Sequence, residues 1–392
     1  MVRSVIVVGG GPVGLVTAYG LARAGIDVTL LEQEHAIGHE PRAMVYSFPT
    51  LDGFGRLGLL EDVEARGVRG RVVNHIVHET GEHIALGMDV LDGVVAHPYN
   101  LHLGQDRLSE IVLEHLNRCP NASVESGVRV TAIDQDAGGV TVQVDATRRL
   151  RAAWVVGADG ARSTVRSALG AEFAGMTWPE RYVAANVDYD FAALGYQDTN
   201  LVIDAEVGGI VARIDAEGLW RCTYSEDAAL PEESVPERMR EHFARAMPDG
   251  EQPEVTAWAH YRMHQRAADR FRVGRVLLAG DAAHVTNTTG AMGLNSGLLD
   301  AFVLVDALAA VIDGTCTDDV LDRYAEARRK VFLERVSPVA SELKRMVYHS
   351  TDPVRLEEDL AGLRAVAADE ARLRERFLFL ASLATPPLVP TG

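Results

Sequence analysis

Cysteine is scarce in this chain, and its three copies are too far apart for the chemistry that cysteine usually supports. Cys119, Cys222 and Cys316 form no C-x-x-C pair. An odd and sparse set argues against a disulfide framework, and it offers no tetrahedral set of zinc ligands. A mechanism based on a redox-active disulfide is therefore disfavoured.

The chain also lacks a basic run. Lys and Arg number 38 against 56 Asp and Glu, which gives a net charge of −18. A surface that binds nucleic acid usually needs clustered positive charge, so we expect no nucleic-acid partner. A local basic pocket is still compatible with this overall balance.

Long hydrophobic runs are missing as well. No apolar stretch reaches the ~18 to 20 residues that a membrane span requires. The apolar residues 298–311 include Asp300 and Asp306, which predicts a buried helix. The N-terminus has no basic segment followed by an apolar core and a cleavage site. We expect a cytoplasmic protein that binds no membrane.

A glycine-rich turn lies close to the start of the chain, in the segment VVGGGPVGLV. It has the spacing G-x-G-x-x-G, with glycines at Gly9, Gly11 and Gly14. An apolar strand precedes it, and a helical pattern and a second apolar strand follow. This order is typical of a βαβ unit whose helix N-terminus, here beginning with Pro12 and Val13, binds the pyrophosphate of a dinucleotide.

Glu32 stands at the end of the second strand, where a carboxylate can accept hydrogen bonds from ribose hydroxyls. A carboxylate would repel a 2′-phosphate. The position, with Gln33 beside it, therefore favours the adenosine of FAD or NAD over that of NADP. A glycine turn with a surface glutamate is the alternative, and the complete order of elements argues against it.

Two further strand ends carry aspartates. The segment WVVGADGARSTVRSALG contains Asp159, and GRVLLAGDAAHVTNTTG contains Gly280 and Asp281. Each aspartate alone would suit the cap of the helix that follows. Because both follow buried strands, where open α/β sheets bind ligands, we interpret both as cofactor contacts. Arg162 and Arg166, four apart on one predicted helical face, either hold a 2′-phosphate or cap a helix.

In this order, the three motifs resemble those of the class A (single-component) FAD-dependent aromatic hydroxylases, the family typified by p-hydroxybenzoate hydroxylase. The resemblance covers most of the chain. It implies that FAD stays bound and that NADH or NADPH visits only to deliver a hydride. It also implies O₂ as a co-substrate and oxygen transfer from a flavin C4a-hydroperoxide to an electron-rich ring.

The resemblance also implies individual cofactor contacts. Asp281 would bind the ribitol of FAD, Asp159 stands at the position of the family's DG motif, and the loop from Gly290 opens a helix against the flavin pyrimidine ring. The expected cofactor residues are Gly9, Gly11, Pro12, Val13, Gly14, Glu32, Gln33, Arg42, Gln105, Asp159, Gly280, Asp281, Gly290, Met292, Gly293, Leu294 and Asn295.

The substrate pocket is marked less clearly. Asn287 and Thr288 stand where the family usually has two prolines, which indicates either a more polar substrate, such as a hydroxypyridine, or neutral drift of the loop. Arg213 falls near the place of a carboxylate-binding arginine in p-hydroxybenzoate hydroxylase, although an exposed strand arginine is the alternative. Asn200 is a fourth substrate candidate. The catalytic candidates are His75, Arg213, Tyr224 and Tyr261. A proton relay or ring contacts are the role considered for His75, Tyr224, Tyr261 and His260, and an ordinary half-buried sheet residue is the alternative for each.

The pattern of elements predicts an α/β fold. We expect a Rossmann-like FAD-binding domain of the glutathione-reductase type, interleaved with a mostly antiparallel β-sheet substrate domain and followed by a C-terminal helical segment. The expected FAD-binding domain comprises residues 1–72, 104–170 and 276–345, the substrate domain comprises 73–103 and 171–275, and the C-terminal segment comprises 346–392.

Together these features predict an NAD(P)H-dependent FAD monooxygenase that hydroxylates a phenol or a hydroxylated heteroaromatic compound. Two alternatives stay open. One is a flavin monooxygenase that hydroxylates or epoxidises a polycyclic natural product, and the other is a non-catalytic FAD-binding protein. The expected partner is a small aromatic molecule, no metal is expected, and the chain would be a monomer or a homodimer.

Overall fold

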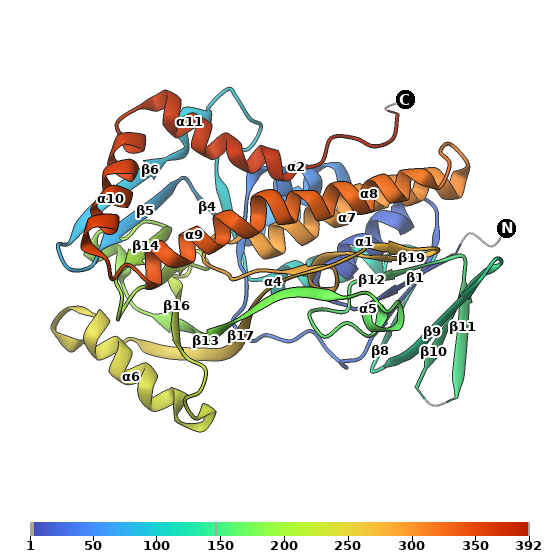
Figure 1. Ribbon diagram of the computed structural model, residues 1–392, viewed down its shortest axis with the longest axis horizontal. Coiled ribbons are helices and arrows are strands. Elements are labelled where there is room, and N and C mark those ends of the chain that lie inside the picture. The colour runs from blue at the N-terminus through green and yellow to red at the C-terminus, as the bar shows by residue number, and fades with distance from the viewer. Residues whose placement is uncertain (1–3, 146, 391–392) are drawn as a thin grey trace.

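The computed structural model describes residues 4–145 and 147–390. Residues 1–3 and 146, which fall in the expected FAD-binding domain, and residues 391–392, which end the expected C-terminal segment, lie outside the described residues. A six-stranded sheet occupies one half of the molecule and an eight-stranded sheet the other. Long helices from the C-terminal part of the chain run along both (Figure 1).

The six-stranded sheet has the order β18-β19-β12-β1-β2-β8 and is parallel except at its edge strand β18. Its central strand pairs Val5 with Trp154 on one side and with Val28 on the other. The inner strands are apolar and buried, as expected for a parallel sheet covered on both faces. The strands are β1 (Ser4–Val8), β2 (Asp27–Glu32), β8 (Ala122–Ser126), β12 (Trp154–Gly157), β18 (Arg272–Val273) and β19 (Val276–Leu278).

One face of this sheet is covered by helices that pack closely. A Cβ added to Gly20 would lie 2.8 Å from Cγ2 of Val305, so the first helix and the long seventh helix approach each other almost backbone to backbone. The helices of this layer are α1 (Pro12–Arg23), α2 (Phe48–Leu57), α3 (Leu60–Arg66), α4 (Gln105–Leu116) and α7 (Met292–Asp313).

Among the described residues, one helix has the length and apolar composition of a membrane span, and it is α7. Most of it is buried inside the protein, and its Asp300 is paired with Arg328 there. The stretch that the sequence predicted to be a buried helix is therefore part of the core.

The opposite face of the six-stranded sheet packs against a short helix and a small antiparallel sheet. Val165 of the helix and Val142 of the small sheet join Ile6 in one apolar cluster. These elements are α5 (Thr164–Ala168), β9 (Val130–Asp136), β10 (Gly139–Val144) and β11 (Arg148–Ala152).

The eight-stranded sheet has the order β20-β17-β13-β16-β15-β14-β5-β6, and its pairs are antiparallel except for β14 with β5. Met239 and Phe243 of α6 (Val235–Ala246) cover one of its faces, packing near Trp220. The strands are β5 (Val72–Val77), β6 (Glu82–Gly87), β13 (Phe173–Asp188), β14 (Thr199–Ile203), β15 (Gly209–Arg213), β16 (Leu219–Asp227), β17 (Glu254–Ala268) and β20 (His284–Val285).

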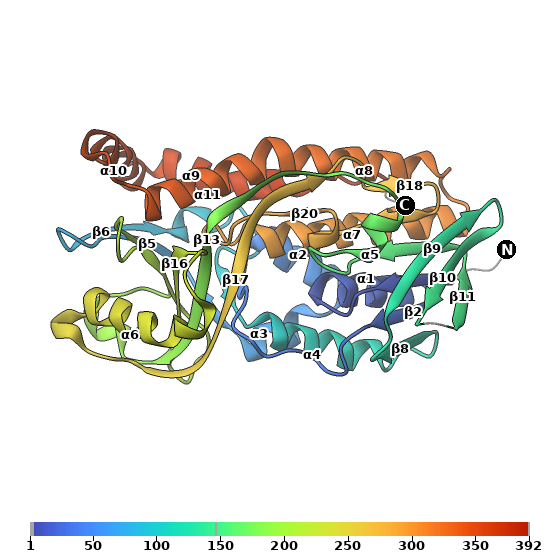
Figure 2. The ribbon, with the colours of Figure 1, turned by 60° about the horizontal axis from the view of Figure 1, so that its bottom comes forward.

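Two long strands, β13 and β17, connect the two halves (Figure 2). The first of them, β13, begins at Phe173 and ends at Asp188. A shift in its pairing with β17 between Thr177 and Arg181, around Pro179, hides the two-residue period of its first half. A second small sheet contains β3 (Val45–Tyr46), β4 (Val68–Gly70) and β7 (Asn100–His102).

The C-terminal helices tie the halves together. After the first of them, one π-helical turn, Phe332–Val336, leads directly into the next. The last two helices turn back over β5 and β6, where Arg364 binds both carboxylate oxygens of Glu82 at 2.7 Å. The four helices are α8 (Asp319–Val331), α9 (Ser337–Tyr348), α10 (Pro353–Ala367) and α11 (Glu370–Leu378).

Candidate active site

The glycine turn between β1 and α1 is shaped by backbone packing. Gly9 has a φ of +107°, and a Cβ on it would overlap the carbonyl oxygen of Ala158. A Cβ on Gly14 would overlap the carbonyl oxygen of Gly9, whereas one on Gly11 would meet nothing within 4 Å. Gly9 and Gly14 are therefore required by the protein itself, and the space at Gly11 is free for a ligand.

The N-terminus of α1 faces this space without a cap. Gly11 is the N-cap residue, and no side chain accepts a hydrogen bond from the first turn. Glu32 lies beside the turn, where its carboxylate accepts hydrogen bonds from the N–H groups of Gly10 and Glu34, the latter at 2.8 Å. Gln33 is exposed next to it. Free N–H groups and a neighbouring carboxylate suit a pyrophosphate and a ribose.

Asp281 follows the end of β19, on a loop that is stabilised by hydrogen bonds to Asp300. Gly280, with a φ of +60°, donates its N–H to Asp300 Oδ2 at 3.0 Å. The same carboxylate accepts hydrogen bonds from His284 Nε2 at 2.7 Å and from Arg328 Nε at 2.6 Å, and all three side chains are buried. Burial raises the pKa of Asp300, but the charges of His284 and Arg328 hold it below the usual range.

The side chain of Asp281 itself is exposed and makes no hydrogen bond to another described residue. Desolvation by the surrounding atoms raises the pKa of its carboxyl, and the charges of His284 and Arg42 act in the opposite direction. An unpartnered carboxylate on a rigid loop is well placed to accept hydrogen bonds from the hydroxyls of a bound polyol.

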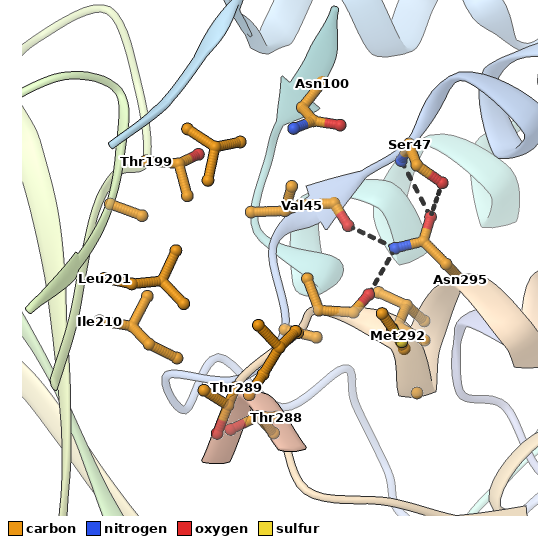
Figure 3. A pocket seen from close by; sticks show the side chains of 18 of the residues that line it. Val45, Ser47, Asn100, Thr199, Leu201, Ile210, Thr288, Thr289, Met292 and Asn295 are labelled. Carbon is orange, nitrogen blue, oxygen red and sulfur yellow. Dashed lines mark hydrogen bonds between the residues drawn. The ribbon is translucent and has the colours of Figure 1, made fainter. Parts of the chain in front are cut away.

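The start of α7 lies opposite this loop. Its N-cap residue, Ala291, has a left-handed φ of +52°, which is strained for a residue with a Cβ, and no side chain caps the helix. Asn295 holds the turn through hydrogen bonds from Ser47 and to the carbonyl oxygens of Val45 and Ala291 (Figure 3). The uncapped N–H groups of this 22-residue helix provide positive potential at the cavity.

A cavity of about 470 Å³ separates the eight-stranded sheet from the start of α7. Figure 3 shows Thr199, Leu201 and Ile210 of the sheet across from Val45 and Met292. The predicted residues that line it are Arg42, His75, Tyr261, Asn287, Thr288, Gly290, Met292, Gly293, Leu294 and Asn295.

Comparison with known proteins identifies the fold and its chemistry. The sequence pattern of a family described as an FAD binding domain matches residues 3–337. The chain belongs to the FAD-binding class A flavoprotein monooxygenases. As a member of this family it is an NAD(P)H-dependent flavin monooxygenase of the aromatic-hydroxylase type, with FAD as its cofactor.

Two curated relatives and one solved structure are similar over nearly the whole chain. The 6-hydroxy-3-succinoylpyridine 3-monooxygenase HspB of Pseudomonas putida is 42% identical over 98% of this chain and 99% of its own. The para-nitrophenol 4-monooxygenase of a Pseudomonas species is 43% identical over 97% and 95%. The crystal structure of p-nitrophenol 4-monooxygenase PnpA from Pseudomonas putida has a TM-score of 0.93 at 42% identity, covering 97% of this chain and 98% of that one.

The residues present fit the FAD that a class A monooxygenase binds. The space at Gly11 and the uncapped start of α1 suit the pyrophosphate, and the unpartnered Asp281 suits the ribitol. The uncapped start of α7 suits a flavin ring that becomes negatively charged on reduction. Arg42 lies on the cavity wall, and Gln105 begins α4 with its N–H bound to the carbonyl oxygen of Ala43 at 3.1 Å.

Two expected cofactor side chains have structural partners instead. Asp159 accepts hydrogen bonds from the N–H groups of Thr164 and Val165 at 2.7 and 3.1 Å and from the Ser163 hydroxyl, so its carboxylate caps α5. The amide of Asn295 is likewise occupied by backbone and side-chain partners within the protein, which leaves only its backbone for a cofactor.

Arg162 and Arg166 do not lie together on one face of a helix, contrary to the prediction from the sequence. α5 begins only at Thr164, so Arg162 precedes the helix and stays exposed. Arg166 is buried, donates to the carbonyl oxygens of Ala282 and Ala161 at 2.9 and 2.7 Å, and stacks on Phe173. Of the two arginines, only Arg162 is free to meet a nicotinamide nucleotide.

Three substrate or catalytic candidates lie away from the cavity. Arg213 donates to the carbonyl oxygens of its own turn, at Asp215 and Ala216. Tyr224 stacks on His242 at 3.8 Å, on the side of the sheet that α6 covers. Asn200 is buried and bound to Asn74 at 3.1 Å, because strand alternation points its neighbours Thr199 and Leu201 at the cavity instead.

The residues that replace the family's two prolines do not loosen the loop. Asn287 donates to Gln265 Oε1 at 3.3 Å and accepts a hydrogen bond from the Thr289 N–H at 3.1 Å, so its amide holds the turn. The hydroxyl of Thr288 is buried at the cavity wall beside the phenols of Tyr182 and Tyr261, where its hydrogen bonding opposes the rise that burial causes in the pKa of each phenol. The substitution therefore keeps a fixed loop and adds one hydroxyl to the cavity wall next to Tyr261.

Sequence reasoning missed two arginines and most of one wall. Arg221 is buried at the cavity, where Nε donates to Asn186 at 2.9 Å and the guanidinium also binds the Arg42 carbonyl. Desolvation lowers its pKa to about 10. The missed wall residues come from the C-terminal segment and are Arg376, Phe377, Phe379, Leu380 and Leu383. An arginine inside the buried pattern LWRCTY was the one available signal.

Proposed function

We propose that this class A monooxygenase hydroxylates a single-ring hydroxyaromatic compound, either a phenol or a hydroxypyridine. The observation that carries the proposal is the mainly apolar cavity of about 470 Å³ at the start of α7. Because the flavin ring would share this space, little more than one further ring is accommodated, which favours this substrate over a polycyclic one. The names of the two relatives, which act on a hydroxypyridine and a nitrophenol, support the same class.

For the cofactor we propose the residues that fit it. Gly11, with the start of α1 at Pro12, Val13 and Gly14, would hold the pyrophosphate, and Glu32 would bind the ribose. The ribitol would lie at Asp281, and the flavin ring would lie at Arg42 and the turn Gly290–Leu294. FAD, when bound, accepts a hydride from NAD(P)H and then activates O₂ for transfer of one oxygen atom.

The remaining steps belong to the cavity. Its apolar walls exclude water from the reacting groups. Burial raises the pKa of the Tyr261 phenol, and the hydrogen bond with Thr288 and the positive charges of Arg221 and Arg42 reduce that rise. The same charges would favour the anionic form of a substrate hydroxyl held beside Tyr261 and Thr288, which makes the ring more nucleophilic.

The test is oxidation of NADH and of NADPH in air by the FAD-loaded protein, with phenols, hydroxybenzoates and hydroxypyridines as substrates. A compound that accelerates oxidation and gains one oxygen atom by mass spectrometry supports the proposal. Accelerated oxidation that yields only hydrogen peroxide for every compound, or no acceleration by any of them, would contradict it. Polycyclic phenols belong in the same series, and acceleration by them alone would favour the alternative of a polycyclic substrate.

We further propose that the chain acts in the cytoplasm as a monomer or homodimer, with the domain boundaries expected above. Membership of a soluble enzyme family supports the location. Light scattering on the purified holoenzyme would distinguish the two assembly states, and a larger particle would contradict both.

A further inference from the structure

The charge of the cavity is opposite to that of the protein. The chain has a net charge of −18, yet three arginines and one glutamate line the cavity. The glutamate, Glu342, is already paired with Arg345 at 2.5 Å and lies 3.5 Å from Arg355. The described wall therefore has an excess of positive charge, and a cavity of this sign attracts an anion.

The three arginines differ in what occupies them. Arg221 binds Asn186 and a backbone carbonyl, and Arg42 lies on the flavin side next to Asp281. Arg376, in the last turn of α11, forms no hydrogen bond and no ion pair with any described residue. The Arg376 side chain is partly open to solvent, and the neighbouring atoms of the cavity wall lower the pKa of its guanidinium by desolvation, with no carboxylate acting in the opposite direction.

The two other arginines of α11 both have partners within the protein. Arg372 lies 3.8 Å from Asp369, and Arg374 donates to the carbonyl oxygen of Val90 at 2.9 Å. A cation in the last turn of a helix also interacts with the helix dipole, but that interaction does not require a place on a cavity wall.

His75 of β5 shares this end of the cavity. It is buried, its Nδ1 has no hydrogen-bond partner, and the charge of Arg376 acts on it. Burial, together with Arg376, lowers the pKa of His75 to about 4, so the imidazole is neutral at neutral pH. Among the described residues, Arg376 is thus the only charged side chain at this end of the cavity, where Leu86 and Phe377 form apolar walls.

We propose that Arg376 is a specificity residue that binds a carboxylate on the substrate, at the end of the cavity away from the α7 N-terminus. A guanidinium matches a carboxylate with two parallel hydrogen bonds, and no described residue occupies the hydrogen-bond donors of Arg376 on the cavity wall. The apolar walls would hold the carbon stem that joins the carboxylate to the ring. The inference rests on the proposed function, and it narrows the substrate class to hydroxyaromatic acids.

The test compares the binding of a carboxylic acid with the binding of its uncharged amide. The probes are 6-hydroxy-3-succinoylpyridine and its primary amide, titrated anaerobically into the FAD-loaded enzyme and followed by the flavin spectrum, with no NAD(P)H present. The wild-type protein should bind the acid more tightly than the amide. Arg376→Gln should weaken binding of the acid about threefold to tenfold, because solvent partly screens the pair, and should leave the amide within about twofold. Arg376→Lys should retain part of the preference.

Arg372→Gln, on the same helix but outside the cavity, is the matched control and should change neither affinity. Equal weakening of acid and amide by Arg376→Gln would overturn the inference, because it would indicate a packing role. So would a wild-type protein with no preference for the acid. Because the titration needs no turnover, these results stand apart from the proposed function, which fails instead if no hydroxyaromatic compound is oxygenated.

Discussion

The cofactor side and the substrate side of this site are built from different kinds of contact. On the cofactor side, Gly9, Gly11 and Gly14 lie within six residues: backbone packing requires Gly9 and Gly14, and Gly11 leaves open the space for a ligand. On the substrate side, the wall draws on β5, β14, β16, α7 and α11, which are spread over most of the chain. The first kind of site follows a local backbone rule, and the second exists only once distant elements have packed.

The largest expected effect concerns the residue that joins the two sides. Arg328 binds Asp300 beneath the Asp281 loop and also the carbonyl oxygen of Leu383, whose side chain lines the cavity. Arg328→Met leaves the buried Asp300 carboxylate without one of its two charged partners. The free energy of unfolding should fall by about 3 to 5 kcal/mol in urea titrations. Arg323→Met, which breaks an exposed pair on the same helix, should change it by less than about 1 kcal/mol. Equal effects would show that the buried cluster has no special role.

A pH effect should distinguish the substrate side. The pKa of His75 is about 4 in the folded protein and near 6.5 in an unfolded chain. Between these values the unfolded state binds the additional proton, so stability is lost as the pH falls from 6.5 to 4. His75→Phe should remove this component, which is worth up to about 3 kcal/mol. The measurement is the unfolding free energy of both proteins at pH 7 and pH 4.5. Parallel pH profiles would contradict the assigned burial.

A smaller effect isolates the cofactor side. Gly11→Ala places a methyl group in space that the protein leaves open. The thermal midpoint of the apoprotein should therefore be unchanged, while FAD affinity falls about tenfold to a hundredfold. Gly362→Ala, at an equally unobstructed glycine inside α10, should leave FAD affinity unchanged and raise the thermal midpoint slightly, because alanine favours the helix. Fluorescence titration of FAD into the apoproteins checks this, and unchanged FAD affinity in Gly11→Ala would place the pyrophosphate elsewhere.

The smallest effect concerns a residue on the substrate sheet that faces away from the cavity. Arg213→Ala removes hydrogen bonds to carbonyl oxygens of its own turn only, so stability should change by less than about 0.5 kcal/mol. The KM and kcat for an aromatic substrate should stay within about twofold. Arg221→Ala, on the cavity wall of the next strand, should change both by more. A loss of activity in Arg213→Ala would return that residue to the substrate site.

The sequence predicted the fold, the family and the cofactor, because each depends on short patterns read in order along the chain. The sequence did not show which of two possible partners a side chain takes. The Asp159 carboxylate accepts hydrogen bonds at the start of α5, and Arg166 donates to a backbone carbonyl oxygen. The sequence also failed on the wall of the cavity. Tertiary packing decides which side chains of β14 point into the cavity. It also decides that α11 folds back over β5 and β6, and no local sequence pattern contains this information.

The most direct test of the whole account is isotopic. The FAD-loaded enzyme would be supplied with NADH or NADPH, a hydroxyaromatic substrate that accelerates its oxidation, and ¹⁸O₂. The account predicts a product that contains one ¹⁸O atom, formed in near one-to-one proportion to the NAD(P)H consumed. Oxygen derived only from water, or NAD(P)H consumption with no labelled product, would contradict it.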